Sequence, residues 1–169
     1  VVPFLGIKIV DVMLAALDAE LVPWALVAGA SEGIGQAWCR KLAECGLDIV
    51  LVARREEPLR EEAAALESRF GVKTRVLALD LAAPDLTARI AAGAGDLDVG
   101  FLVYNAAFAD IREYLDQSLE SKLATLDVNC RGLLLLTSYY APRLVARGHG
   151  GMLLMSSMSG WQGAALMGV

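Results

Sequence analysis

The stretch WALVAGASEGIGQAW, residues 24–38, decides the fold. It opens on an apolar run, and AGASEGIG, residues 28–35, then leads into a helical pattern that begins at Gly33. Glycines between a strand and a helix allow a tight turn and a close approach of backbone N–H groups to a ligand. About half a positive charge accumulates at a helix N-terminus. The stretch therefore predicts a strand, a loop and a helix that together bind a pyrophosphate.

The rest of the chain alternates short apolar runs with helical periodicity, which is typical of βαβ units. We therefore predict an α/β fold over residues 24–169, a Rossmann-type doubly wound parallel sheet with helices on both faces. Its C-terminal strands are expected to lie beyond this sequence. The predicted strands are 24–29, 48–53, 74–79, 99–105 and 152–155, and the predicted helices are 33–45, 58–70, one from about 84 and a long one from about 119.

Three of these helices carry an apolar face. In the first two it is the face expected to pack on the sheet, and in the long helix it hints at partners. The residues of each face recur at helical spacings of three and four. They are Ile34, Ala37, Trp38 and Leu42 in the first helix, Leu59, Ala63, Leu66 and Phe70 in the second, and Leu119, Leu123, Leu126, Cys130, Leu133 and Thr137 in the long helix.

The composition argues against several functions. The chain is 56% hydrophobic with a net charge of −5, so binding of nucleic acid, which rests on clustered Lys and Arg, is not predicted. The lone His149 has no second strong ligand nearby, and no metal site is predicted. The three cysteines, Cys39, Cys45 and Cys130, show no CxxC spacing. This favours free thiols in a reducing compartment, and we expect a cytoplasmic protein.

Residues 1–23 precede the first predicted strand as an N-terminal extension that we expect to be helical. Charged residues interrupt its apolar sequence, so a membrane-spanning helix is not predicted, and contact with a membrane surface is the alternative. Residue 1 is Val and not Met. We therefore expect the sequence to begin inside a longer product. The interrupting charges are Lys8, Asp11, Asp18 and Glu20.

Four motifs in order along residues 24–169 resemble the short-chain dehydrogenase/reductase family. The first is the Gly-x-x-x-Gly-x-Gly spacing of residues 29–35, although Ala28 stands where the family usually has Thr. Asp80 at the end of the third strand is similar to the family's adenine-binding Asp, or it caps a helix. Asn105-Ala106-Ala107 resembles Asn-Ala-Gly, and Asn129 in DVN resembles the helix Asn whose carbonyl holds a water, or it is a solvated helix residue.

The resemblance implies an oxidoreductase that binds a nicotinamide dinucleotide and acts on a small-molecule carbonyl or alcohol substrate. It also implies a homo-oligomer. Ser157 and Asn129 would serve catalysis. The residues implied to bind the cofactor are Gly29, Ser31, Glu32, Gly33, Ile34, Gly35, Arg54, Arg55, Asp80, Leu81, Asn105, Ala106 and Ala107.

The end of the second strand, VARRE, bears on the choice of cofactor. NAD-binding proteins place an acid there for the ribose 2′-OH, whereas NADP requires a cation for the 2′-phosphate. Arg54 lies 25 positions after Gly29, and a guanidinium can bind phosphate in bidentate fashion. We predict NADP in preference to NAD. The alternative is that Arg54 and Arg55 are solvated partners of Glu56 and Glu57, and Glu32 in the glycine loop also weighs against NADP.

Ser157 in SSMSG follows the last predicted strand and matches the family serine that hydrogen-bonds the substrate oxygen. Ser159 is the alternative, and Ser156 is expected to be structural. In the family, a Tyr-x-x-x-Lys motif follows about a dozen residues later. Thirteen positions after Ser157 lies one position past Val169, and no Tyr in the chain has a Lys four residues on. We therefore expect the 169 residues to be inactive by themselves.

Two other functional classes remain open on the sequence. A non-catalytic dinucleotide-binding or redox-sensing module would share the glycine loop and Arg54 but would have no use for Ser157. A serine hydrolase is the weaker alternative, because its nucleophile requires a Gly-x-Ser-x-Gly elbow, which MSSMSG does not provide.

Overall fold

Five parallel strands form a single sheet in a computed structural model that describes residues 22–157 and 166. The spatial order is β3-β2-β1-β4-β5, with β1 at the centre, so the direction of winding reverses between β1 and β4. Ligands bind at such switch points in open α/β sheets. The strands are β1 (Trp24–Ala28), β2 (Asp48–Ala53), β3 (Thr74–Ala78), β4 (Val99–Tyr104) and β5 (Gly151–Leu154).

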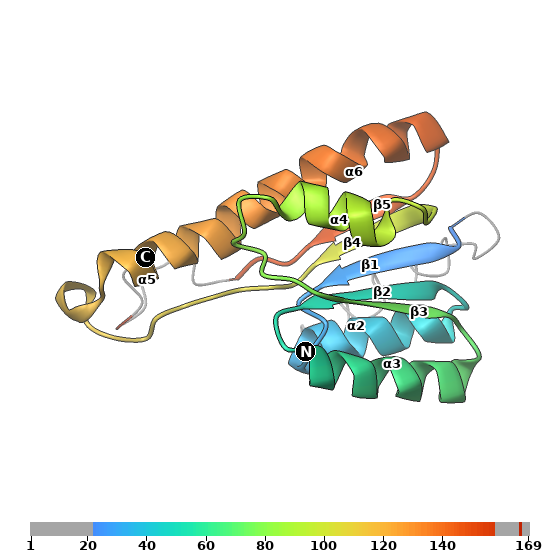
Figure 1. Cartoon of the computed structure of the whole chain (residues 1–169), viewed down its shortest axis with the longest axis horizontal. Helices are drawn as coiled ribbons and strands as arrows, with labels where there is room; N and C mark the ends of the chain where they lie inside the picture. Colours follow the sequence, from blue (N-terminus) through green and yellow to red (C-terminus); the bar gives the residue numbers. More distant parts are fainter. Residues whose placement is uncertain (1–21, 158–165, 167–169) are drawn as a thin grey trace, which may run out of the picture.

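Helices cover both faces of the sheet (Figure 1). Two of them, α2 (Gly33–Glu44) and α3 (Glu56–Phe70), lie on one face. The other face carries α4 (Leu86–Ala94) and a long helical segment made of α5 (Leu119–Leu126), the π-helical turn η2 (Asp127–Gly132) and α6 (Leu133–Arg147). A short 3-10 helix, η1 (Tyr114–Asp116), precedes α5. The predicted doubly wound α/β fold is confirmed.

Alternate residues of each strand point to opposite faces, and this divides the core in two. Val27, Ile49 and Leu51 pack with α2 and α3. Leu26 and Val50 pack with α4 and α6 on the other side. Both faces of the central strands are therefore buried, which explains why their sequences are continuous apolar runs.

The predicted boundaries of the strands are confirmed within one residue, but α3 begins two residues before Pro58, at Glu56. Pro58 lies in the first turn, where its missing N–H group needs no helical partner. The predicted face of α3 is confirmed, since Leu59 and Leu66 are fully buried and Phe70 packs against them. Of the extension over residues 1–23 that is predicted to be helical, residues 1–21 lie outside the described residues.

The predicted packing face of α2 is wrong in two of its four residues. Ile34 is 59% exposed and Ala37 is exposed, whereas Gly35 and Cys39 are buried with Leu42. The physical reason is the close contact between Gly35 and the preceding loop, which turns the Gly35 side of the helix toward the sheet. Only Trp38 and Leu42 of the predicted face pack against the core.

The apolar face of the long helix, which in the sequence hints at partners, is largely exposed. Leu119, Leu123 and Leu126 are exposed, and so is Cys130. Figure 1 shows the cause, because α5 extends past the strands of the sheet. The π-helical turn η2 also breaks the 3.6-residue period, so that Leu136 and Tyr140 form the buried face of α6.

A buried ion pair joins α2 to α3. The Glu62 side chain is only 2% exposed and accepts hydrogen bonds from Arg40 Nε and Nη2 and from Gln36 Nε2, each at 2.7 Å. The Arg40 side chain is half exposed. Every oxygen of this carboxylate therefore has a partner, as burial of a charge requires.

We expect Arg40→Met to lower the free energy of unfolding by about 2–4 kcal/mol, because it leaves the buried Glu62 carboxylate without its cation. The matched control is Arg60→Met, which removes the exposed partner of Glu56 on α3 and should leave the free energy of unfolding nearly unchanged. Urea denaturation followed by tryptophan fluorescence measures both. Equal losses in the two variants would contradict this assignment.

Candidate functional site

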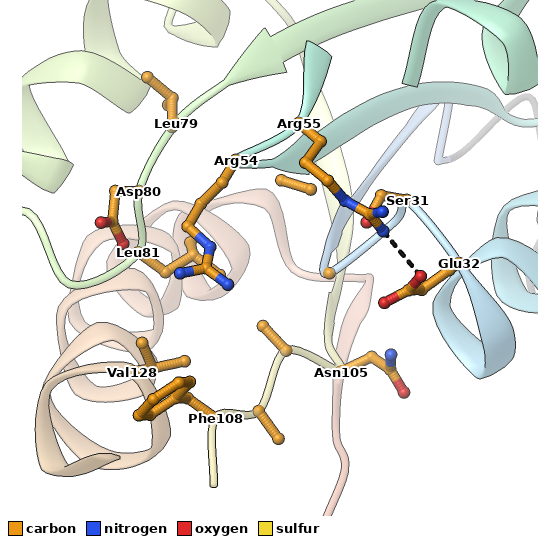
Figure 2. Close-up of a pocket in the computed structure, with 14 residues that line it drawn as sticks. Ser31, Glu32, Arg54, Arg55, Leu79, Asp80, Leu81, Asn105, Phe108 and Val128 are labelled. Carbon is orange, nitrogen blue, oxygen red and sulfur yellow. Dashed lines mark hydrogen bonds and ion pairs between the residues drawn. The ribbon is translucent and has the colours of Figure 1, made fainter. Parts of the chain in front are cut away.

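A cavity of about 430 Å³ opens at the carboxyl ends of the strands (Figure 2). It lies between the loop after β1, the end of β2, the segment after β3 and the loop after β4. Ten of the thirteen residues predicted to bind a cofactor line it. They are Gly29, Ser31, Glu32, Arg54, Arg55, Asp80, Leu81, Asn105, Ala106 and Ala107.

Backbone-to-backbone contacts shape the loop after β1. Gly29 has φ of +87°, and a Cβ added there would lie 2.7 Å from the backbone nitrogen of Ala106. A Cβ added at Gly35 would lie 1.9 Å from the carbonyl oxygen of Gly29. Both positions therefore require glycine, because any larger residue would push the loop off β4 and off the start of α2.

Three predicted cofactor residues, Gly33, Ile34 and Gly35, do not line the cavity. Gly33 begins α2 with φ of +59°, and Ile34 is turned to solvent. Gly35 is buried behind the loop, where it supports Gly29. These residues shape the loop and the helix start, and the sequence spacing could not distinguish that role from contact with a ligand.

The two arginines after β2 lie in different environments. Arg55 Nη2 donates to Glu32 Oε2 at 2.7 Å, whereas Arg54 makes no hydrogen bond or ion pair within the described part of the chain. Figure 2 shows the Arg54 side chain directed toward Leu81 and that of Arg55 directed toward Glu32. Glu56 pairs with Arg60 on its own helix, so the alternative pairing of Glu56 with these arginines is not found.

Asp80 stabilises a turn at the cavity wall. Its Oδ1 accepts a hydrogen bond from the backbone N–H of Ala82 at 2.9 Å. The next helix, α4, begins only at Leu86, so Asp80 is not a helix cap. Its side chain is exposed to the cavity side of the turn, and Oδ2 remains available to a donor on a ligand.

Asn129 lies in η2 and binds the loop that follows β4. Its Oδ1 accepts from the backbone N–H of Phe108, and its Nδ2 donates to the Phe108 carbonyl, both at 2.8 Å. Asn129 is therefore not merely a solvated helix residue. Its neighbour Val128 lines the cavity together with Phe108. The Val128 carbonyl accepts from Tyr104 at the end of β4, and burial raises the pKa of that phenol.

Four lining residues were missed by the sequence analysis. Ala53 and Leu79 each immediately precede a residue that was predicted to bind the cofactor at a strand end. Their position next to these residues is a signal in the sequence that could have identified them. Phe108 and Val128 could not be found in this way. They come from the loop after β4 and from the π-helical turn, which only the contact through Asn129 brings together.

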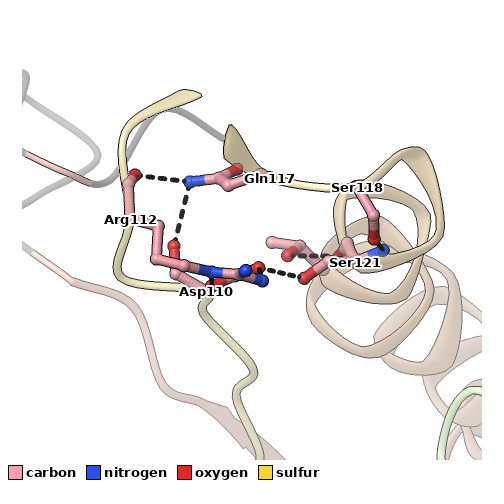
Figure 3. Close-up of polar contacts among 6 residues, drawn as sticks. Asp110, Arg112, Gln117, Ser118 and Ser121 are labelled. Atoms are coloured by element: carbon pink, nitrogen blue, oxygen red, sulfur yellow. Dashed lines mark hydrogen bonds and ion pairs between the residues drawn. The ribbon is translucent and has the colours of Figure 1, made fainter. Parts of the chain in front are cut away.

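A hydrogen-bonded network fixes the loop over residues 108–118 to the start of α5 (Figure 3). The Asp110 carboxylate accepts from Arg112 and from the Ser121 hydroxyl, the latter at 2.6 Å. Gln117 is buried, and its Nε2 donates to the carbonyls of Asp110 and Arg112 at 3.0 and 2.9 Å. The loop that carries Phe108 is therefore held at both ends, by Asn129 and by this network.

Ser157 follows β5 at the same edge of the sheet as the cavity. The strand continues one residue beyond its end through a hydrogen bond from Met155 N–H to the Tyr104 carbonyl at 2.9 Å. Ser157 is exposed and is not among the lining residues of the cavity. The alternative serine, Ser159, lies outside the described residues.

A family model described as short chain dehydrogenase matches residues 23–169. The chain belongs to this family. Among relatives of this short-chain dehydrogenase, the 7beta-hydroxysteroid dehydrogenase of Mediterraneibacter gnavus is 33% identical over 137 residues, which are 81% of this chain and 52% of the relative. The chain thus spans about half the length of the curated relatives it matches.

Solved structures of other short-chain dehydrogenases agree with this assignment. A 7beta-hydroxysteroid dehydrogenase superposes with a TM-score of 0.85 at 32% identity, covering 89% of this chain and 58% of the other. A short-chain dehydrogenase from Sphingobium yanoikuyae in complex with NADPH superposes with a TM-score of 0.76 at 32% identity, covering 83% and 55%. The oxidoreductase family and its dinucleotide-binding fold are therefore established for this chain.

Three further findings concern the described residues alone. None of their helices is both long enough and apolar enough to cross a membrane. They contain no cluster of three His, Cys, Asp or Glu side chains that could hold a metal ion. The three cysteines are free, with Cys39 buried, Cys45 half-buried and Cys130 exposed.

Protonation of Asp110 should loosen the loop. Hydrogen bonds from Arg112 and from Ser121 lower the pKa of Asp110 to about 2, from an ordinary value of 3.8. Because the pKa is lower in the folded state, this stabilisation is complete above about pH 4 and is lost as the pH falls through 2. We expect Asp110→Asn to be less stable than the unmodified chain at neutral pH, with the difference shrinking between pH 4 and 2.

Chemical denaturation at a series of pH values measures this effect. The control is Asp116→Asn, which removes an exposed acid from the same loop and should show no such trend. A constant difference between Asp110→Asn and the unmodified chain over this pH range would show that the carboxylate charge does not hold the loop.

Proposed function

We propose that these residues bind NADP in an oxidoreductase that transfers a hydride between the nicotinamide and a carbonyl or hydroxyl carbon. The observation that carries the proposal is Arg54, a guanidinium that lines the cavity and makes no hydrogen bond or ion pair within the described residues. A planar cation in this position suits a phosphate group. The acid that NAD-preferring proteins place at the end of the second strand is absent.

The cavity residues fit a dinucleotide on two structural grounds. An added Cβ at Gly35 would collide with the Gly29 carbonyl and would lie 2.9 Å from Asn105 Nδ2, so glycine alone permits the close packing beside the first turn of α2. That turn offers backbone N–H groups to a pyrophosphate. The volume of about 430 Å³ lies within the usual range for small-molecule sites.

The proposed contacts follow the shape of the cavity. The loop after β1 and the α2 N-terminus hold the pyrophosphate, and Arg54 with Arg55 holds the 2′-phosphate. Asp80 accepts a hydrogen bond from the adenine amine, and the segment over residues 105–107 faces the nicotinamide. Support for NADP also comes from the Sphingobium yanoikuyae relative, whose structure contains NADPH.

We expect Arg54→Ala to weaken NADPH binding by about tenfold or more while changing NADH binding little, because only NADPH carries the 2′-phosphate. Fluorescence titration of each reduced dinucleotide measures the two dissociation constants. Arg60→Ala is the control, since it removes an exposed arginine outside the cavity. An equal loss for both dinucleotides in Arg54→Ala would assign the arginine a structural role instead.

The proposed chemistry assigns substrate orientation to Ser157. When bound, the dinucleotide supplies or accepts the hydride. The Ser157 hydroxyl donates a hydrogen bond to the substrate oxygen and holds it as negative charge develops there. Asn129 holds Phe108 and so fixes the wall of the cavity. No residue of the chain is assigned the proton transfer, since none of its tyrosines has a Lys four residues on.

The test uses a polypeptide that carries these residues together with an acid/base group. In it, we expect Ser157→Ala to lower kcat/KM by about a hundredfold, because the substrate oxygen loses its hydrogen-bond donor. The dissociation constant for NADPH should not change. Ser156→Ala is the matched control and should keep its activity. If NADPH binds but no carbonyl or alcohol compound is turned over by the unmodified polypeptide, the chain is the non-catalytic binding module instead.

We propose an apolar, lipid-like or small carbonyl compound as the substrate. Support comes from the similar relative that is named for its action on a hydroxysteroid. We also infer a homo-oligomer, because apolar side chains are exposed along the loop after β4 and along α5. They are Ile111, Tyr114, Leu115, Leu119, Leu123 and Leu126.

A further inference from the structure

A second, smaller cavity of about 130 Å³ lies at the amino end of β4. It opens between the end of α4 and the C-terminal half of α6, which lie side by side over the same face of the sheet (Figure 1). The larger cavity is at the opposite, carboxyl ends of the strands. The smaller one has more room than a single water molecule needs. The polar and charged residues that line it are Asp98, Tyr139, Tyr140, Arg143 and Arg147.

The Tyr140 hydroxyl is a buried polar group at this cavity. Tyr140 is 2% exposed, and its hydroxyl oxygen exchanges no hydrogen bond with any of the described residues. Such a group costs free energy, because folding has removed its bonds to water without replacing them. Burial raises the pKa of this phenol, and the Arg143 cation opposes the rise, so the two side chains lie within electrostatic reach of each other.

The Arg143 guanidinium is already oriented at the same cavity. Its Nη1 donates to the Tyr139 carbonyl at 2.6 Å, and its central carbon lies 3.7 Å from the centroid of the Tyr139 ring. A guanidinium carries five N–H donors. Those on Nε and Nη2 make no hydrogen bond within the part of the chain that the structure describes. A ligand therefore meets donors whose side chain has already lost much of its conformational freedom.

The charges at the cavity favour an anion. Arg143 and Arg147 each bring a positive charge, and the one carboxylate, Asp98, accepts a hydrogen bond from Arg147 Nη1. The ends of α4 and α6 oppose an anion, each with about half a negative charge, but this effect falls off within the last turn of a helix. Arg143 lies four residues before the end of α6, so its full charge is the nearer one.

We propose that this cavity binds a small oxyanion, a carboxylate or phosphate group, between the Tyr140 hydroxyl and the Arg143 guanidinium. The oxyanion supplies the acceptor that the Tyr140 hydroxyl lacks. Arg143 contributes charge-assisted hydrogen bonds, which are stronger than bonds between neutral groups. The bound anion joins α4 to α6 at the edge of the sheet away from the larger cavity, so it leaves the proposed dinucleotide site open.

Thermal unfolding in the presence of phosphate tests the proposal. At constant ionic strength, about 50 mM inorganic phosphate in place of chloride should raise the melting temperature by about 3 °C, because a ligand that binds only the folded state stabilises it. Tyr140→Phe and Arg143→Gln should each lose most of this rise. A rise that both variants keep in full would overturn the proposal.

Acetate at the same ionic strength separates the two classes of oxyanion. A rise in melting temperature with acetate alone assigns the site to a carboxylate, and a rise with phosphate alone assigns it to a phosphate. A rise with both assigns it to the oxyanion group that they share. No rise with either one refutes the site.

The control for the place of binding is Arg54→Ala, because Arg54 lines the larger cavity and not the smaller one. This variant should keep the response to phosphate. A response that is lost in Arg54→Ala and kept in Arg143→Gln would place the phosphate in the larger cavity and contradict the inference.

Tyr140→Phe gives a second, independent result. In phosphate-free buffer it should raise the melting temperature by about 2 °C, because it removes a buried hydroxyl that has no partner. Tyr114→Phe is the control, since Tyr114 is exposed and lies outside the cavity, and it should change the melting temperature little. A lower melting temperature in Tyr140→Phe would show that water already satisfies the hydroxyl, and the proposal would fail.

Discussion

The site depends on the backbone contact among Gly29, Gly35 and Ala106. At these points the loop after β1, the first turn of α2 and the segment after β4 approach so closely that a single added carbon atom would meet backbone atoms at 1.9 to 2.8 Å. The contact places the N-terminus of α2 at the switch point of the sheet, where winding reverses between β1 and β4. The positive end of the helix dipole and the cavity therefore occupy the same place.

Polar side chains hold the opposite wall of the cavity. Asn129 binds both backbone groups of Phe108, and the network of Asp110, Gln117 and Ser121 fixes the same loop to α5. A connecting segment with little secondary structure of its own needs such bonds, because its backbone groups have no partners in a helix or sheet. The wall that faces the proposed nicotinamide position is consequently as well defined as the glycine loop.

The helical faces show where reasoning from sequence was incomplete. Apolar residues that recur at spacings of three and four identify a helix. The spacing does not indicate whether a sheet lies beneath that helix. In α5 the leucines repeat regularly and remain exposed because this helix extends past the sheet. In α2 the contact at Gly35 overrides the start of the apolar stripe, so Gly35 and Cys39 are buried with Leu42 while Ile34 is exposed.

The sequence by itself determined the order of strands and helices, the doubly wound class and most of the residues at the cavity. It could do so because the apolar period, the glycine spacing and the residues at strand ends are local features. Only the tertiary structure decided that Arg55 pairs with Glu32 while Arg54 does not, and that Phe108 and Val128 join the cavity. These facts depend on contacts between segments more than twenty residues apart, such as Asn129 with Phe108, and no local pattern encodes such distances.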